Sequence, residues 1–237
     1  MRLSSRLIVA AAIAVLLLPG RAVQAADDKE RVLRQLDAAA AKFRNTTADF
    51  QFHSIQTDPV PDEDVQEGTV YYERNGANFQ MAGHIKKVNQ KPLLKVYTYS
   101  KGVFQLFEKA INQITLFKTS NSVESYLRLG FGASGKDLES SWEVKYLGSE
   151  TLKDGNTPVR TEKLDLVPRD QAVRKNIAHV TIWIDPERAV SMKQIFYENS
   201  YQRRECFYFN VKVNAPQPAD AYTLPLDPKS KPNVISK

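Results

Sequence analysis

The feature that most constrains this chain is a long succession of short segments in which apolar and polar residues alternate, separated by turn signals. One segment, ADFQFHSI (48–55), places Phe50 and Phe52 on one face and polar residues on the other. Asn75-Gly76 is a strong tight-turn signal between two later segments. The pattern predicts about ten or eleven strands. Turns of hairpin length leave no room for crossover helices, so the strands should pair antiparallel.

A meander of this length curls into a barrel or a strongly bent sheet, and the few helices must then cover one mouth or one face. The first predicted helix opens at Asp27 and Asp28, and its apolar stripe consists of Val32, Leu36, Ala40 and Phe43. A second helical piece carries Val123, Tyr126 and Leu127 at helical spacing. The Pro-rich tail after the last long strand should be extended and end in short edge pairings.

The first 25 residues have the pattern of a secretory signal peptide. Arg2 and Arg6 precede an apolar run, Leu7–Leu18, and VQA ends at Ala25 with small or short residues where a signal peptidase cuts. The run is shorter than the roughly 20 residues that a comfortable membrane span needs. We therefore expect an exported protein with residues 1–25 removed and residues 26–237 forming a single domain; an uncleaved N-terminal anchor is the alternative.

Charge and cysteine content exclude some classes of protein. The net charge is +6, and it falls to +3 once Arg2, Arg6 and Arg21 are removed with the signal. Such a mild excess does not indicate a nucleic-acid-binding protein. Cys206 is the single cysteine, so no disulfide within the chain is possible and the core must supply the stability.

No catalytic motif is visible. His53, His84 and His179 are isolated, without a His or Cys partner at metal-ligand spacing. GFGASG (130–135) is rich in glycine, but it does not follow a strand and open a long helix as a phosphate-binding loop must. We interpret it as a flexible break between helical pieces. The sequence predicts no enzyme, no metal site and no cofactor.

One hairpin has apolar residues on both faces. In KGVFQLF (101–107), Val103 and Phe107 point one way, whereas Phe104 and Leu106 point the other. Many strand positions elsewhere in the chain are aromatic. These side chains can fill a core, or they can line a pocket for an acyl chain between the sheet and short helices.

The order of motifs then suggests a family. The first helix enters the first strand through LRQLDAAAAKFRNTTADFQF (33–52), and the motifs that follow are GTVYYER (68–74), KGVFQLFEKAINQI (101–114), LDLVP (164–168), VTIWIDP (180–186), MKQIFYE (192–198) and YTLPLDPKSKPNVI (222–235). Over essentially the whole mature chain this order resembles the periplasmic outer-membrane lipoprotein carrier family, LolA.

The resemblance implies a mainly β (α+β) fold, an unclosed antiparallel half-barrel with a few helices as a lid. It implies a monomeric periplasmic carrier that receives lipoproteins from an inner-membrane lipoprotein-releasing ABC complex and passes them to an outer-membrane acceptor. On this basis we predict an acyl cavity lined by Phe50, Phe52, Tyr72, Phe104, Leu106, Ile114, Phe196, Phe207 and Phe209, and a lid carrying Leu36, Phe43, Tyr126 and Leu127.

The family also has an Arg after the second strand that bonds to the lid and holds it closed. Arg74 matches that place, although Asn75 stands where the family usually has Pro. Two alternatives stay open: a periplasmic carrier or sensor of another envelope lipid, and an exported β-domain with a fully packed core and no ligand.

Overall fold

A computed structural model describes residues 20–76, 78–118, 126–200 and 202–236, with side chains from Ala26 onward and not for Asn75. Most of the predicted signal peptide, and Val123 of the predicted second helix, lie outside the described residues. The strands are β1 (Asn45–Gln56), β2 (Asp62–Asn75), β3 (Asn78–Val88), β4 (Lys91–Ser100), β5 (Val103–Glu108), β6 (Gln113–Lys118), β7 (Trp142–Asp154), β8 (Thr157–Pro168), β9 (Ile177–Asp185), β10 (Val190–Glu198), β11 (Gln202–Val213) and β12 (Asn233–Ser236). The helices are α1 (Gly20–Ala40), α3 (Gly135–Ser141), α4 (Gln171–Arg174) and the 3-10 helix η1 (Lys109–Ile111).

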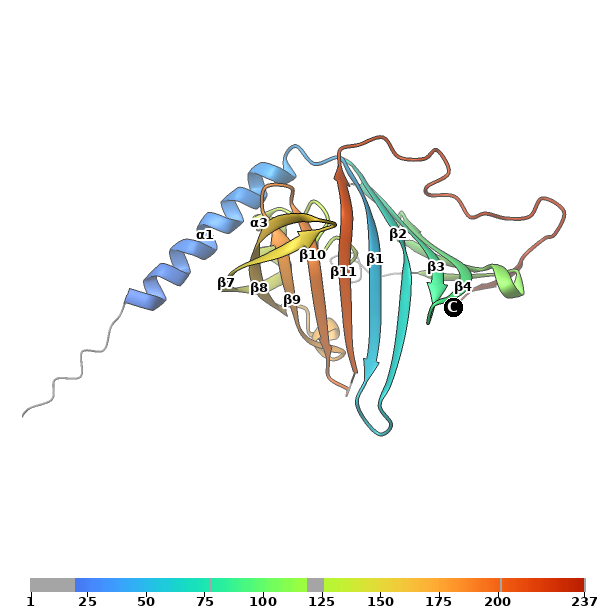
Figure 1. Ribbon diagram of the computed structural model, residues 1–237, viewed down its shortest axis with the longest axis horizontal. Coiled ribbons are helices and arrows are strands. Elements are labelled where there is room, and N and C mark those ends of the chain that lie inside the picture. Colours follow the sequence, from blue (N-terminus) through green and yellow to red (C-terminus); the bar gives the residue numbers. More distant parts are fainter. Residues whose placement is uncertain (1–19, 77, 119–125, 201, 237) are drawn as a thin grey trace, which may run out of the picture.

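All the strands listed belong to one curved sheet (Figure 1). Its order is β12-β6-β5-β4-β3-β2-β1-β11-β10-β9-β8-β7, so β12 and β7 are the edges and the sheet is not closed. Every pairing is antiparallel except that of β12 with β6. The predicted fold class is confirmed. The twelfth strand is the short pairing of the Pro-rich tail.

The sheet has two faces that differ in what covers them. We call the face that carries Phe50, Tyr72 and Leu164 the inner face, because α1 and the loop before α3 pack on it. Residues directly opposite in paired strands share a face. Phe50 is opposite Tyr208, and Tyr99 is opposite Phe104, so both pairs belong to the inner face.

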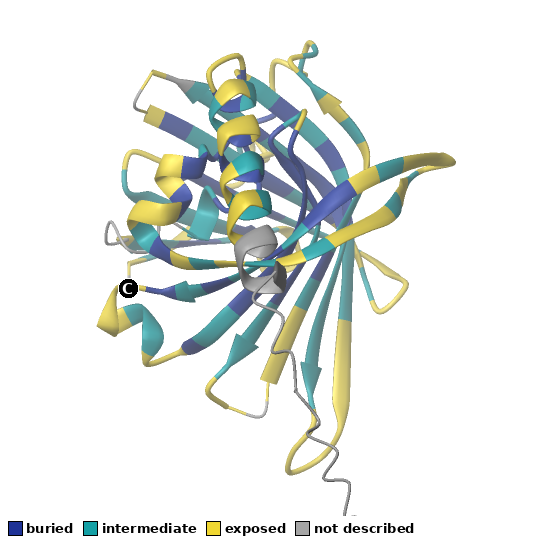
Figure 2. Cartoon of the chain, turned by 90° about the vertical axis from the view of Figure 1, so that its left-hand side faces the viewer, coloured by how far each residue is buried: buried dark blue, intermediate teal, exposed yellow. Residues whose placement is uncertain are grey.

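The helix α1 covers the inner face of β7–β9. Val32, Leu33 and Leu36 are buried in one cluster with Leu164, Ile182 and other strand residues. Figure 2 shows the helix lying across the sheet, with its exposed residues turned away from the strands. The helix begins at Gly20, seven residues before the predicted start at Asp27. Within the described residues, no helix is both long and apolar enough to cross a membrane.

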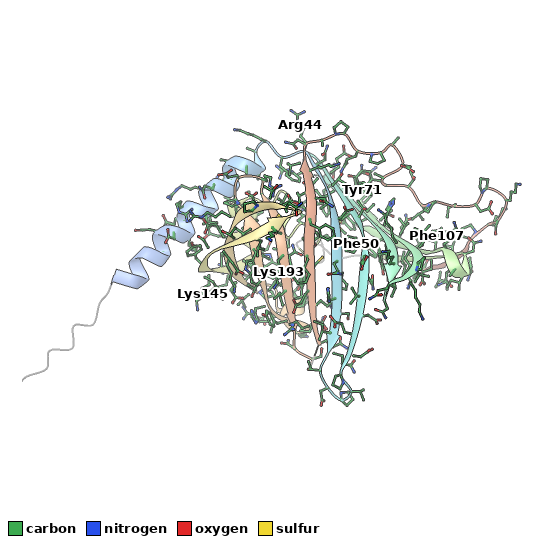
Figure 3. The ribbon with its side chains drawn as sticks, in the orientation of Figure 1. Arg44, Phe50, Tyr71, Phe107, Lys145 and Lys193 are labelled. Carbon is green, nitrogen blue, oxygen red and sulfur yellow. The ribbon has the colours of Figure 1, made fainter. Side chains whose placement is uncertain are left out.

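The two-faced hairpin is explained by the C-terminal tail. Phe104 and Leu106 belong to the inner face, whereas Phe107 is buried on the outer face with Val96 and Ile114. Leu224 of the tail packs on this outer cluster, which lies in the part of the sheet next to η1 (Figure 3). The second apolar face of the hairpin therefore binds the chain's own tail.

Cys206 is buried on the inner face of β11, opposite Phe52 of β1. Burial raises the pKa of its thiol to about 12, because the thiolate would lose its hydration. The thiol is therefore protonated at neutral pH and should be inert.

We predict that a thiol reagent such as Ellman's reagent modifies native Cys206 about a thousandfold more slowly at about pH 8 than a free cysteine, because so little thiolate is present. Absorbance at the wavelength of the released thiolate measures the rate. The same protein in concentrated guanidinium is the control and should react completely. Rapid labelling of the folded protein would contradict the burial.

Candidate functional site

A row of stacked aromatic rings crosses the inner face. Tyr99 stacks on Phe79 with ring centroids 4.8 Å apart, Phe79 on Tyr72 at 5.4 Å, and Tyr72 on Phe131 at 5.8 Å. The rings come from β4, β3, β2 and the loop before α3, so the row joins the sheet to its cover. Each pair adds about 0.5–1.5 kcal/mol beyond the area that it buries.

Beside this aromatic row, the inner face is apolar but only partly covered. The side chains share a face by pairing, since Tyr97 is opposite Leu106 and Phe104 is opposite Phe117. We call this set the open apolar surface: Phe52, Met81, Val88, Tyr97, Phe104, Leu106 and Phe117, all partly exposed. Five of the seven pack against the buried cluster around Phe50, so this surface extends the core into a part of the inner face that is only partly covered. A contiguous, partly exposed apolar patch is typical of an interaction site.

Six of the nine predicted cavity residues lie on the inner face. Phe50 and Tyr72 are buried there in the protein's own core. Phe52, Phe104 and Leu106 belong to the open apolar surface, and Phe196 packs partly exposed beside the cluster under α1. Sequence reasoning missed Met81, Val88, Tyr97 and Phe117, although Tyr97 could have been found as the residue opposite Leu106 in a tight hairpin.

The other three predicted cavity residues lie on the outer face, and their assignment to the cavity is corrected. Ile114 is opposite Phe107, so it faces the tail and not Phe104. Phe207 packs against His53 on the outer face, with ring centroids 5.5 Å apart, and Phe209 is 37% exposed.

A β-bulge explains the error for β11. Phe207, Phe209, Val211 and Val213 alternate in the sequence, which predicts a common face. The pairing with β1 shifts by one residue beside Asn210, whose φ is +53°. The extra residue turns Val211 and Val213 to the inner face and leaves the two phenylalanines outside.

The cover of the inner face contains the four predicted lid residues. Leu36 of α1 is fully buried, and Phe43 follows the helix and packs on Tyr72 with ring centroids 5.8 Å apart. Tyr126 packs edge-on against Trp142, and Leu127 packs on the cluster around Phe50. Burial raises the pKa of Tyr126 to about 12, so its hydroxyl is neutral.

Arg74 joins two parts of the cover. Its side chain reaches from the end of β2 and donates to the carbonyl of Ala40 at 3.1 Å and to that of Gly132 at 2.9 Å. Ala40 is the last residue of α1, where carbonyls lack helical partners and the helix dipole favours a cation. A guanidinium bonded to both carbonyls ties the end of α1, the loop before α3 and the sheet together.

The glycine-rich segment 130–135 is not a flexible break, contrary to the sequence interpretation. Phe131 bridges to Val190 of β10, and Gly132 N–H donates to the carbonyl of Ala189 at 2.8 Å. A Cβ on Gly132 would lie 2.4 Å from the Phe43 ring, and one on Gly135 would lie 2.5 Å from the carbonyl oxygen of Leu33. The segment is glycine-rich because the cover packs closely on both sides of it.

The structure also holds a polar pocket of about 560 Å³ under the middle part of α1. It is lined by Arg31 and Gln35 of α1, by the β7–β8 hairpin and by the turn after β9. At its floor Glu162 is 1% exposed and accepts from Arg31 at 3.3 Å and from the Tyr146 hydroxyl at 2.8 Å. This interaction is a second attachment of α1 to the sheet.

No group of three or more His, Cys, Asp or Glu side chains suited to a metal ion occurs in the described part of the chain. His53 is bound to Glu63 at 2.5 Å, and His179 to Asp165 at 2.6 Å, each beside an aromatic ring on the outer face. Both pairs are parts of the strand surface. The site that the geometry favours is the open apolar surface with its cover.

Comparison with known proteins gives the fold and no family. No family model and no curated protein sequence matches the chain. An uncharacterized conserved protein from Thermus thermophilus is 12% identical, covers 89% of this chain and 99% of its own, and has a TM-score of 0.50.

More distant structural similarity extends to two further proteins. LprF from Mycobacterium bovis is 12% identical over 85% of this chain and 98% of its own, with a TM-score of 0.45. A LolA superfamily protein from Nitrosomonas europaea is 13% identical over 83% of this chain and 97% of its own, with a TM-score of 0.39.

The packing of the cover predicts unequal costs for two glycine substitutions. Gly132→Ala should lower the free energy of unfolding by about 2 kcal/mol more than Gly76→Ala, because both glycines have positive φ but only Gly132 meets a ring. Urea unfolding of the two variants measures the difference. Equal losses would mean that the loop is not packed against Phe43 in solution.

Proposed function

We propose that this chain is a periplasmic carrier that binds the acyl chains of lipoproteins on the open apolar surface and moves them from the inner to the outer membrane. The observation that carries the proposal is the extent of this surface, to which β1, β3, β4, β5 and β6 contribute beside the cover that Arg74 bonds to. The fold, the resemblance of the motifs and the predicted signal peptide are consistent with it.

The driving force for such a carrier is hydrophobic. Each methylene group that leaves water contributes about 0.8 kcal/mol, so a long acyl chain gains roughly 10 kcal/mol before the costs of ordering it. Partly exposed aromatic and aliphatic side chains such as Phe104 and Leu106 suit this ligand because they offer no fixed polar contact. Cargoes with different headgroups can therefore share one surface.

Arg74 has the position of a latch. Its bonds to Ala40 and Gly132 stabilise the closed arrangement of α1 and the loop before α3. An acyl chain that enters under this cover must displace it, and closure of the cover then favours release of the chain. The latch thus sets the balance between holding cargo and handing it to an acceptor.

The alternatives differ in what the surface binds. A carrier or sensor of another envelope lipid uses the same apolar surface with a different headgroup, whereas a packed exported β-domain has no ligand. Native mass spectrometry of the protein purified from the periplasm separates these functions: co-purifying lipoprotein supports the proposed carrier, another lipid supports the second function, and a bare protein that binds no hydrophobic dye supports the third.

A matched pair of substitutions tests the location of the surface. Phe104→Glu on the inner face should weaken binding of a fluorescent fatty acid at least tenfold, because the acyl chain would have to desolvate a carboxylate. Phe209→Glu on the outer face, where the ring is 37% exposed, should leave binding unchanged. Fluorescence titration gives both affinities, and equal losses in the two variants would exclude the inner face as the binding site.

Replacement of Arg74 tests the latch. Arg74→Leu should slow transfer of bound lipoprotein to acceptor membranes about tenfold or more, because each bond from a charged group to a carbonyl stabilises the closed cover by about 1.5–3 kcal/mol. Arg44→Leu is the control, since Arg44 is exposed beside the same strand end. The rate of transfer to acceptor vesicles is measured by sedimenting the vesicles at successive times. An unaltered rate in Arg74→Leu would show that Arg74 does not control release.

A further inference from the structure

The polar pocket lies where β9 ends and β8 continues. The pairing of β8 with β9 ends at Glu162 opposite Ile184, whereas β8 begins at Thr157. On its other side β8 is paired with β7 from Thr157 onward. In the described chain, residues 157–160 therefore have a strand neighbour on one side only, and the position beyond them is the one that a longer β9 would occupy.

The walls of the pocket match this missing strand. Thr157, Pro158, Val159 and Arg160 form one wall, and the turn after β9, with Pro186 and Glu187, forms another. Arg31 and Gln35 of α1 lie over the space. A strand rises about 3.3 Å per residue, so the free edge is about 13 Å long. That length and the volume of about 560 Å³ suit a short extended peptide.

The charges of the lining favour a ligand with both donors and acceptors. The pocket is lined by three arginines and four acidic residues. The deeper carboxylates are already bonded: Glu162 to Arg31, and Asp154 and Asp185 to Arg188 at 2.9 and 2.6 Å. The lining therefore has no large excess of either charge that would bind a single anion or cation. Its polar side chains also disfavour an acyl chain. A peptide backbone, in contrast, can form main-chain hydrogen bonds with the free edge of β8.

We propose that this pocket is a strand-addition site that binds an extended segment of a partner polypeptide along Thr157–Arg160. The bound segment takes the place of the missing part of β9. It pairs with the main-chain groups on the free edge of β8, to which Pro158 contributes a carbonyl but no N–H, and its side chains meet Arg160 and Glu187 at the mouth. Main-chain pairing gives the affinity, and the mixed charges at the mouth select among segments. This site is separate from the open apolar surface and does not depend on the binding of lipid there.

A tethered peptide tests the site. Because native Cys206 is buried, Glu187→Cys supplies a thiol that can be modified selectively at the mouth of the pocket. The probe is the peptide acetyl-Cys-Ser-Thr-Val-Thr-Val-Thr-Ser-amide, attached by a disulfide. Hydrogen exchange is then measured at the amides of Val159 and Arg160, of which the one facing the pocket should exchange at least tenfold more slowly with the peptide attached.

Three controls make the outcome decisive. A peptide with every second amide nitrogen methylated should give no protection, because it cannot donate to β8. The same peptide attached at Lys109→Cys, on exposed η1, should not protect these amides either. Gln35→Cys brings the peptide from α1 instead, in case Glu187→Cys disturbs the turn. Protection by the unmethylated peptide alone supports the site, whereas no protection from either tether, or equal protection by the methylated peptide, overturns it.

Discussion

The structure depends on a mismatch between a long curved sheet and a short cover. Twelve strands provide more inner apolar surface than α1 and the loop before α3 can bury. Over β7–β9 the helix buries the inner face with Val32, Leu36 and their neighbours, and a conventional core results. Over β3–β6 the inner face has no such helix among the described residues, and Phe104, Leu106 and Phe117 remain partly exposed. The sheet therefore has a closed core at one end and the open apolar surface at the other.

The sequence predicts the fold better than it predicts the site, for a physical reason. Strand number and order follow from local signals, since each turn is read from two or three residues such as Asn75 and Gly76. The face of a side chain depends on a count along the strand, and one inserted residue reverses it. The bulge at Asn210 makes this difference for Phe207 and Phe209, because nothing in their alternation with Val211 reveals it. Ile114 fails for another reason: the outer face beneath the tail is also apolar, so hydrophobicity does not distinguish the two faces.

Contacts of the cover were predictable only in part. Motif order places an arginine at position 74, but the acceptors, the carbonyls of Ala40 and Gly132, lie 34 and 58 residues away in the chain. The prediction of a flexible break at the glycine-rich segment is wrong because glycine is compatible with two opposite situations: a mobile chain, or a chain packed so closely that a Cβ does not fit. Gly132 against Phe43 and Gly135 against Leu33 belong to the second. The residues next to a glycine in the sequence cannot distinguish a mobile segment from a closely packed one, because the packing partners are distant along the chain.

The polar bonds that join α1 to the sheet at Arg74 and at Arg31 differ in the groups that they pair. At its C-terminal end Arg74 bonds to neutral carbonyls, so opening there separates a charge from dipoles and leaves the guanidinium to water. Near the middle of the helix Arg31 bonds to Glu162, a carboxylate that is 1% exposed and also accepts from Tyr146 and Ser149. Opening there would remove a charged partner from a buried carboxylate. The helix should therefore open more readily at Ala40 than at Arg31. Opening at Ala40 would uncover Phe43, Tyr72 and the aromatic row, the side of the cover nearest the open apolar surface. The proposed lipid surface and the proposed strand-addition site therefore depend on different contacts of the same helix, Arg74 at its C-terminal end and Arg31 near its middle.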